Sequence, residues 1–535
     1  MSREKICNCA VLAGITSGTG VSEFSRRVLE ACEVRPGLYV LHPEFERVNF
    51  YSQQLRVLAL VAELSSTGRL PKGARNVAVV GAGIAGLTAA AALATMGAAV
   101  TVYEEEATFL SRYRDANHRE LHPNISAWPF QPLRAITNLP FLNWCCHQAS
   151  EVRGQIKDEW DDRFGKKIPL VRQAITRIES SASGVVLSGP DFHAERDLAV
   201  VTVGFLEDMI TSGPPQNTYW HSATMPARSI VTVSGVGDGG LIDVATQFYG
   251  HKTVDATRAL AHAVDAELAE DVRMAEGQAT ELAVRAKQAT DKADQDRFRK
   301  EAQERLAAYY PRLRLGADCD GVMSAFEINE ERHVNVYYRP SPSPYRPLAA
   351  PINKVMLAYC IGKFETQIEC VQGQSTREPT AITFNPPPGR YDPAHVLVRH
   401  GDFHAAYSIL GAENIAVVED KEKRCADLLS EIVEDEYDEE LYVRTPVKPF
   451  GPKSSNDFVA DVEPLLFKLL SHCDRGRHIQ YRAARDEKAI VLHAKDGLPA
   501  YIRSMFPITV YDIEIRFGES GPFTYPAVPS LELKQ

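Results

Sequence analysis

Residues 76–106 fall into apolar blocks in the order strand, helix, strand. Residues 77–80 (VAVV) form an uninterrupted apolar run, as buried parallel strands do. Residues 87–96 are rich in alanine, which favours a helix, and Gly97 follows where a helix-ending glycine is expected. Residues 98–103 form a second apolar run. The pattern therefore predicts a complete βαβ unit.

The turn between the first strand and the helix carries three glycines, and the second strand ends in an acid. Gly81, Gly83 and Gly86 have the spacing G-x-G-x-x-G, and Glu104 lies 18 positions beyond the third. These glycines would permit a tight turn, close approach of a diphosphate to the backbone, and close packing of the helix on the strand. The N–H groups at the helix start would bind the diphosphate. Glu104 would bind ribose hydroxyls and disfavour a 2′-phosphate, so the site predicted is for a dinucleotide other than NADP.

Three further regions have informative patterns. Residues 52–64 predict a helix with a broad apolar face, with Ser52 as its N-cap, packed on the dinucleotide domain. Residues 256–311 are rich in Ala, Glu, Lys and Arg and predict an inserted helical hairpin. A solvated pair of helices fits this composition best, and a cover for the active site or a contact surface for a second copy or a partner is the alternative. Residues 348–361 form a buried element, and Pro351 leaves open whether it is a helix or a strand.

The segment 109–144 is irregular and rich in Arg, His, Pro and aromatic residues. Long irregular segments in compact domains often carry function. Arg112, Arg114 and Arg119 could neutralise a diphosphate or orient an anionic substrate. His118 and His122 are the candidates for proton transfer, because imidazole titrates near neutral pH. A surface loop with solvated arginines is an equally good interpretation. Beyond the segment, the adjacent Cys145 and Cys146 are expected to be two buried thiols, because a disulfide between neighbours is strained.

A β-meander is predicted over residues 167–189, followed by an apolar strand over residues 197–205. With the glycines and Glu104, this order resembles the FAD-binding domain of the flavoprotein superfamily with two dinucleotide-binding domains, which includes glutathione-reductase-like and amine-oxidase-like enzymes. The resemblance covers residues 76–205 and implies FAD as the cofactor. It places Gly204 at the strand end that lies near the flavin.

A second glycine cluster follows a second predicted strand, at residues 229–234. Gly235, Gly237 and Gly240 again have G-x-G-x-x-G spacing, and residues 241–250 predict a helix. The next strand, at residues 333–339, comes only after the helical insertion; it could complete the unit and bring Arg339 near a cofactor. In the reductase branch of the family, a second unit at this distance binds NAD(P)H. Gly237–Asp238 also resembles the family's Gly-Asp motif that touches FAD, as does Gly401–Asp402. A nicotinamide site, an FAD contact and a structural turn all remain open.

Composition excludes several classes of protein. The net charge of −11 over 535 residues argues against nucleic-acid binding, which needs a positive field. No apolar run is long enough for a membrane span, and the N-terminal apolar piece is too short for a secretory signal. Ten cysteines without a C-x-x-C motif indicate a reducing, cytoplasmic compartment. The spacing of His395, His400 and His404 predicts no metal site.

The expected fold is α/β: a Rossmann-type FAD-binding parallel sheet with a β-meander, a long helical insertion and a second α/β region. The expected domains are an N-terminal helical extension (1–74), the FAD-binding domain (75–228), the second α/β region (229–253 with 331–420), the insertion (254–330), and an acidic segment, linker and small α+β cap (421–535). The residues expected to bind cofactor are Gly81, Gly83, Ile84, Ala85, Gly86, Glu104, Arg112, Arg119, Gly204, Gly237 and Asp238.

The expected function is an FAD-dependent oxidoreductase that acts on a small molecule and is reduced by NAD(P)H. An FAD-dependent amine or amino-acid oxidase is the alternative within the family. A sensor or scaffold that binds FAD or NAD together with a partner is the alternative from another class. The absence of a redox dithiol motif near the first helix disfavours a disulfide reductase.

Overall fold

The computed structural model describes most of residues 23–426 and four short strands near the C-terminus. The described residues are 23–41, 48–70, 76–117, 119–131, 133, 137, 139–181, 184–204, 220, 228–326, 331–339, 342–377, 382–390, 392, 395–399, 405–426, 479–484, 489–494, 509–510 and 513–517. His118, Gly401, Asp402 and the helix expected near residues 462–472 lie outside them. No helix within these ranges has the length and apolar character needed to cross a membrane.

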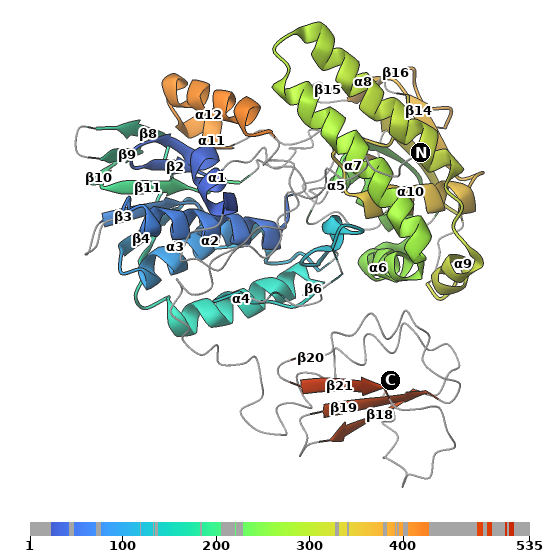
Figure 1. Cartoon of the computed structure of the whole chain (residues 1–535), viewed down its shortest axis with the longest axis horizontal. Coiled ribbons are helices and arrows are strands. Elements are labelled where there is room, and N and C mark those ends of the chain that lie inside the picture. Colours follow the sequence, from blue (N-terminus) through green and yellow to red (C-terminus); the bar gives the residue numbers. More distant parts are fainter. Residues whose placement is uncertain are drawn as a thin grey trace, which may run out of the picture.

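The first sheet is built around the predicted βαβ unit (Figure 1). Its strand order is β1-β2-β11-β3-β4-β7, and only the β1–β2 pair is antiparallel. The strands are β1 (Glu33–Arg35), β2 (Leu38–Val40), β3 (Asn76–Val80), β4 (Ala99–Glu104), β7 (Leu170–Arg172) and β11 (Leu198–Val201). The N-terminal region, expected to be only helical, thus adds two strands to this sheet.

Helices cover the first sheet and supply most of its core. They are α1 (Glu23–Cys32), α2 (Phe50–Ser66), α3 (Ile84–Thr95) and α4 (Ala149–Arg163). Helix α2 is almost entirely buried and packs against α1 and α3, as its broad apolar face predicts. Its N-cap is Asn49 and not Ser52: the Asn49 side chain accepts from Ser52 N at 2.7 Å, and Ser52 Oγ accepts from Asn49 N at 3.0 Å. Ser52 is therefore the N3 residue of a capping box, and its side chain accepts from the backbone N–H of the N-cap residue.

A small antiparallel sheet lies between β7 and β11 in the chain. It consists of β8 (Arg177–Ser180), β9 (Val185–Gly189) and β10 (Phe192–Arg196) in the order β10-β9-β8. The predicted meander is therefore present as a three-stranded sheet, with β10 as its third strand. Residues 170–172, which were expected in the meander, form β7 of the main sheet instead. In the described part of residues 109–144, which were expected to be irregular, the only regular elements are the short 3₁₀ turns Ser111–Tyr113 and Ile125–Ala127 and the two-residue strand β5 (Glu120–Leu121). This strand pairs with β6 (His147–Gln148).

The second sheet repeats the topology of the first. It consists of β12 (Ile230–Ser234), β13 (His333–Tyr338), β14 (Ile368–Gln372) and β17 (Val396–Val398), all parallel, in the order β14-β13-β12-β17. In both sheets the four successive strands of the unit lie in the spatial order third, second, first, fourth, as in a Rossmann half. An antiparallel excursion separates the third and fourth strands in each; here it is the hairpin β15 (Gln374–Arg377) and β16 (Ile382–Asn385).

The helices of the second unit are α5 (Asp238–Tyr249) and α10 (Pro351–Lys363). Pro351 occupies the first turn of α10, where its missing N–H costs nothing. The element expected at residues 348–361 is therefore a helix that begins at the proline, and the strand alternative was wrong.

The helical insertion lies between α5 and β13, as predicted. It contains α6 (Thr253–Ala263), α7 (Ala266–Gln288), α8 (Lys292–Tyr309) and α9 (Ala317–Met323), with 3₁₀ turns at Gly250–Lys252 and Tyr310–Arg312. A fully buried ion pair anchors it to the second unit: Lys354 Nζ lies 2.6 Å from Glu276 Oε2. The Tyr310 hydroxyl donates to Glu276 Oε1 at 2.5 Å.

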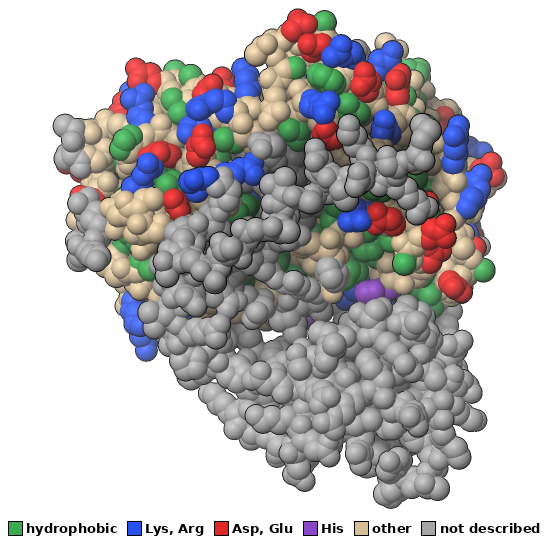
Figure 2. Space-filling model, in the orientation of Figure 1, with side chains coloured by type: hydrophobic (Ala, Val, Ile, Leu, Met, Phe, Trp, Pro, Cys, Tyr) green, Lys and Arg blue, Asp and Glu red, His purple; other side chains and the backbone are tan. Residues whose placement is uncertain are grey.

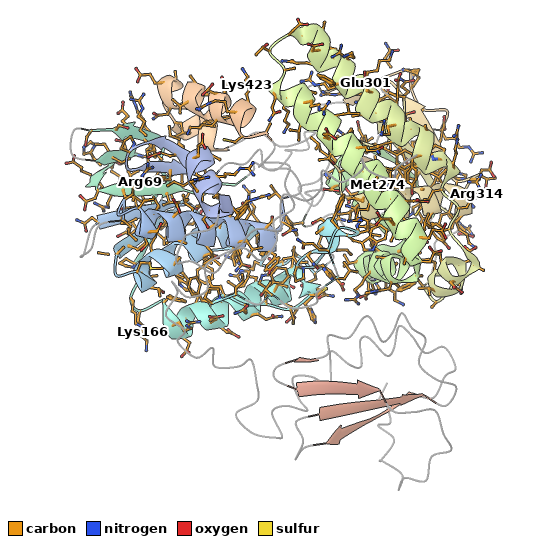
Figure 3. All side chains as sticks on the ribbon, in the orientation of Figure 1. Arg69, Lys166, Met274, Glu301, Arg314 and Lys423 are labelled. Carbon is orange, nitrogen blue, oxygen red and sulfur yellow. The ribbon has the colours of Figure 1, made fainter. Side chains whose placement is uncertain are left out.

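The visible face of the α7–α8 hairpin carries interspersed acidic and basic side chains (Figure 2). Met274 on α7 and Glu301 on α8 are labelled in Figure 3. Met274 is half exposed, but apart from it Leu170 is the only large apolar side chain exposed among the described residues. The hairpin therefore fits the solvated pair of helices that its composition favours.

The chain returns to the first unit after β17. Helices α11 (Ala405–Ile409) and α12 (Ala412–Arg424) follow, and Leu410 forms a β-bridge with Ile178 of the meander. Arg35 Nε donates to the Asn414 side chain of α12 at 2.9 Å. Near the C-terminus, β18 (Ile479–Ala484), β19 (Ala489–Ala494), β20 (Thr509–Val510) and β21 (Ile513–Phe517) form a separate sheet in the order β18-β19-β21-β20.

Candidate functional site

The first glycine-rich turn, which we call turn 1 (Gly81–Gly86), leaves β3 at its carboxyl end. Gly81 has a φ of +99°, a conformation that favours glycine, and its N–H donates to Tyr103 O of β4 at 2.8 Å. Thr202, just beyond β11, donates its hydroxyl to the carbonyls of Val80 and Gly81, at 3.0 and 3.1 Å. The turn is thus held from both neighbouring strands.

Gly83 and Gly86 have different roles in turn 1. A Cβ built on Gly83 would meet nothing within 4 Å, so this side of the turn is open. A Cβ on Gly86 would lie 1.9 Å from Gly81 O and 2.7 Å from Thr202 Oγ1. Gly86 therefore allows α3 to pack against the strand. Gly83 is the N-cap of α3 without a side-chain cap, so the first N–H groups of the helix, from Ile84 and Ala85, have no side-chain acceptor there. This geometry fits a diphosphate.

Glu104 ends β4 beside turn 1, as predicted. Its Oε2 accepts from Ala82 N in the turn at 2.7 Å, and its Oε1 accepts from Glu106 N at 3.0 Å. The carboxylate therefore fixes the turn from the end of β4. Gly204, in contrast, is exposed and lies three residues beyond the end of β11.

The second turn, turn 2 (Gly235–Gly240), repeats the main features of the backbone geometry of turn 1. Gly235 has a φ of +113°, and its N–H donates to Tyr337 O at 2.9 Å. Gly237 caps α5 with φ and ψ of −75° and −179°, against −73° and −177° at Gly83. A Cβ on Gly240 would lie 2.0 Å from Gly235 O. Both helices are 12 residues long, and the structure thus contains two dinucleotide-type turns.

The charged groups around the two turns differ. Val80 pairs with Tyr103, and Ser234 pairs with Tyr337, so Tyr338 takes the place of Glu104 in the second unit. Arg339 follows it and is exposed. The exposed Arg346 brings its Nη1 to 4.0 Å from the Cβ position of Gly237. The second unit therefore has arginines near turn 2, whereas the first unit has the acidic Glu104 beside turn 1.

Asp238 lies in the first turn of α5, and its carboxylate already has two partners. Asp238 Oδ1 accepts from Ala350 N at 2.7 Å and from Asn353 Nδ2 at 2.8 Å, both at the start of α10. These bonds tie α5 to α10 within the second unit, which supports a structural part for Asp238.

The candidate arginines of the irregular segment have different surroundings. Arg119 is buried against α5, where it pairs with Asp243 and donates to Thr246 Oγ1 at 3.3 Å. Arg114 is exposed and donates to Thr108 Oγ1 at 2.8 Å. Arg112 lies in the 3₁₀ turn Ser111–Tyr113. Since the charge of Arg119 has a buried partner in the second unit, we do not retain Arg119 as a cofactor ligand.

His122 lies in a buried polar cluster between the irregular segment and α6. The cluster consists of His122, Cys146, Asp255, Arg258 and His262. Arg258 Nη2 pairs with Asp255 Oδ1 at 2.6 Å, and its Nη1 lies 3.7 Å from Cys146 Sγ. Cys145 and Cys146 are both free and buried, as expected.

Burial controls the protonation of this cluster. Burial, and then the positive charge of Arg258, lowers the pKa of His122 well below its ordinary value and that of His262 to about 4. Burial also raises the pKa of the Cys146 thiol. All three groups are therefore neutral near pH 7. His122 Nδ1 accepts from Asn124 N at 3.3 Å, which assigns the ring proton to Nε2.

Sequence reasoning missed the residues that connect the two units. Asp243, Arg258 and Arg399 carry no motif, and Arg119 and Asp243 are 124 positions apart in the chain. One local signal was available: Asp255, Arg258 and His262 recur at helical spacing on one side of α6, and such a polar stripe on a helix with buried residues indicates a buried cluster.

One comparison with known protein families matches the first unit. Residues 76–199 match the family described as FAD dependent oxidoreductase. No curated protein matches the chain. Among solved structures, bacillithiol disulfide reductase from Staphylococcus aureus is 10% identical, with a TM-score of 0.36, over 63% of this chain and 80% of that one. Thioredoxin reductase from T. acidophilum is 10% identical, with a TM-score of 0.32, over 67% and 98%.

A third similarity, to S-allyl-L-cysteine S-oxygenase from Allium sativum, has 18% identity and a TM-score of 0.22 over 32% of this chain and 48% of that one. These TM-scores are too low to carry an argument, so the identification depends on residues 76–199 and on the geometry of turn 1. On that basis residues 76–199 are similar to an FAD-dependent oxidoreductase domain, and turn 1 has the backbone geometry of a dinucleotide-binding turn.

Proposed function

We propose that the flavin of this oxidoreductase is reduced by NADPH bound at turn 2, and that the reduced enzyme then acts on a small molecule. The observation that carries the proposal is the repetition of turn 1 by turn 2, down to the positive φ of the first glycine and the helix-capping geometry of the second. A chain with one turn for FAD has a second turn of the same construction available for another dinucleotide.

The residues proposed to hold FAD are those of turn 1 and Glu104. The N–H groups of Ile84 and Ala85 would bind the diphosphate, with Gly83 leaving room for it. Glu104 would accept from the ribose hydroxyls. When bound, FAD supplies the two-electron redox chemistry.

The basic groups of the second unit support NADPH over NADH. Tyr338 replaces the acid that would repel a 2′-phosphate, and Arg339 follows directly. Arg346 approaches Gly237, where the diphosphate would lie. A guanidinium binds phosphate through two parallel hydrogen bonds, so these two arginines suit a nucleotide with an extra phosphate.

We keep His118 and His122 as the proposed residues for proton exchange with the substrate. Neutral His122 carries its ring proton on Nε2 and is therefore a hydrogen-bond donor at that atom. Its burial beside Cys146 and Arg258 means that a substrate reaching it would be shielded from water.

Anaerobic titration of the FAD-loaded protein tests the proposal. NADPH should bleach the flavin absorbance near 450 nm at lower concentration than NADH. Arg339→Gln should raise the NADPH concentration for half reduction about tenfold, the cost of a lost charged phosphate contact, and leave that for NADH nearly unchanged. Arg314→Gln is the control, because Arg314 is an exposed arginine of the helical insertion, away from turn 2 (Figure 3).

Other outcomes of the titration would support one of the alternative functions. Flavin that bleaches with an amine or amino acid, and with neither nucleotide, would replace the proposal by an amine or amino-acid oxidase. Flavin that no reductant bleaches would indicate a sensor or scaffold. A preference for NADH would contradict the role given to Arg339.

A further inference from the structure

The two units differ at two buried positions directly behind their turns. Aligned on the first residues of α3 and α5, Ala89 of the first unit corresponds to Asp243 of the second. Thr202 and Arg399 also correspond, because each donates its backbone N–H to the last residue of the first strand, Val80 O at 2.9 Å and Ser234 O at 2.6 Å. An uncharged pair in one unit is thus a charged pair in the other.

Asp243 receives two arginines from different parts of the chain. Its Oδ2 lies 2.7 Å from Arg399 Nε, in an ion pair without the alignment of a hydrogen bond. Its Oδ1 accepts from Arg119 of the FAD-binding unit. The Asp243 side chain is 1% exposed, and those of Arg119 and Arg399 are 5% and 7% exposed. The three charges are therefore held out of water and interact strongly.

This trio touches turn 2 itself. The Arg399 carbonyl lies 2.0 Å from the Cβ position of Gly235, and the Arg399 Cβ lies 3.7 Å from that of Gly240. The trio therefore lies directly behind the turn at which a diphosphate is expected. Movement of α5 or of Gly235 on nucleotide binding would be felt by Arg399 and Asp243, since packed interiors transmit strain.

The Arg119 end of the trio belongs to a segment that is built into the second unit. Trp128 comes from the irregular segment of the FAD-binding unit, yet it is buried in the hydrophobic core of the second unit. Ile125 packs against the same core. Arg119 thus begins a stretch that contacts the second unit, whereas Ala116, three residues earlier, accepts a hydrogen bond from Ser150 N of α4 in the first unit.

We propose that Asp243 is a positioning residue that couples turn 2 to residues 119–131 of the FAD-binding unit, through Arg399 on one side and Arg119 on the other. The inference rests on the proposed function, because the nucleotide that Asp243 senses is the NADPH of turn 2. Occupation of turn 2 tightens the Arg399–Asp243–Arg119 contacts and thereby fixes the segment that crosses between the two units. Asp243 does not touch the reacting atoms.

Three variants of the FAD-loaded protein test the coupling. Asp243→Asn removes the central charge. Arg119→Met removes only the contact with the FAD-binding unit and leaves the Asp243–Arg399 pair, so it serves if Asp243→Asn does not fold. Glu276→Gln is the matched control, because it makes the same chemical change in an ion pair that is equally buried but lies between the insertion and α10.

Hydrogen–deuterium exchange and stopped-flow flavin reduction are the measurements. In the wild type, NADP⁺ should slow exchange in both peptides 235–250 and 119–131. In Arg119→Met and Asp243→Asn, protection of 235–250 should persist, protection of 119–131 should disappear, and the limiting rate of flavin reduction should fall about tenfold with normal FAD content. Glu276→Gln should retain protection of both peptides and the wild-type rate.

Some results would overturn the coupling alone, and one would overturn both the coupling and the proposed function. The coupling alone would be overturned if NADP⁺ still slowed hydrogen exchange in peptide 119–131 of Arg119→Met. It would also be overturned if that variant reduced its flavin at the wild-type rate. Loss of bound FAD in Arg119→Met would also overturn it and return Arg119 to the cofactor site. A wild type in which NADP⁺ protects neither peptide and neither NADPH nor NADH bleaches the flavin would overturn the proposed function and the coupling together.

Discussion

Gly83 and Gly86 lie three residues apart in turn 1. An added methyl group should impair cofactor binding at Gly83 and the stability of the fold at Gly86. In Gly86→Ala the new methyl would collide with Gly81 O and Thr202 Oγ1, so α3 must move away from β3. We expect a loss of about 2 to 3 kcal/mol in the free energy of unfolding, as overpacking typically costs.

Gly83→Ala is the informative partner of that variant. Its methyl meets open space in the protein alone, so the unfolding temperature should change little, while the methyl should obstruct the diphosphate and lower FAD content. Thermal unfolding and flavin absorbance after desalting distinguish the two variants. Full FAD content in Gly83→Ala would place the diphosphate elsewhere.

At the residue scale, the sequence predicted what depends on local spacing. The positive φ of Gly81, the N-cap position of Gly83 and the place of Glu104 all follow from one continuous stretch. Arg119 could not be placed in this way, because a guanidinium can reach any nearby acid. Its actual partner, Asp243, is brought to it by the docking of one unit on the other.

Helix α6 carries one of the two buried histidines, His262 and His122, whose lowered pKa values should make the stability of the protein depend on pH. Its His262 has a pKa of about 4 in the folded state, lowered by burial and by Arg258, against about 6.5 when unfolded. Between these values the unfolded chain binds the proton and the folded chain does not. Stability should therefore fall as pH falls from about 6.5 to 4, by roughly 3 kcal/mol from this residue.

Replacing His262 by Gln measures that contribution. The difference in unfolding free energy between pH 7 and pH 5 should be smaller in His262→Gln than in the wild type. His193→Gln is a suitable control, since His193 is exposed on β10. An unchanged difference in His262→Gln would show that other groups, such as His122 and the carboxylates, account for the acid sensitivity.

At the element scale, long periodic or apolar stretches were predictable and short ones were not. Helix α2, the insertion and strands β3, β4, β12 and β13 appear where the sequence indicated them. The strands β1 and β2 have three residues each, too few for a periodic signal, and they join the sheet only because β11 pairs with β2. Helix α10 shows a second limit, because a proline can begin a helix as well as end one.

At the scale of the whole molecule, the two units are joined by segments that cross between them in both directions. Residues 119–131 reach from the first unit to the second, and α11 and α12 return from the second to the first. Leu410→Ala removes buried contacts between this return segment and Ile178 of the meander. It should lower the free energy of unfolding by about 2 to 4 kcal/mol.

Arg35→Ala is the control for that variant. Arg35 also joins the return segment to the first unit, through a hydrogen bond to Asn414 and an ion pair with Glu413, but its side chain is 39% exposed and that of Glu413 is 85% exposed. Such a pair contributes little, so urea unfolding should shift by less than about 1 kcal/mol. Equal effects of Leu410→Ala and Arg35→Ala would mean that the apolar contact does not hold the return segment.

The place of the helical insertion has a consequence for synthesis of the protein on the ribosome. The first unit can form its sheet as soon as residues 33–201 have emerged, because its strands are complete by then. In the second unit, β12 must wait for β13 while residues 235–332 are translated, and closing so long a loop delays the pairing. The nascent chain therefore carries a finished FAD-binding sheet whose meander is not covered by Leu410 until the second sheet has closed.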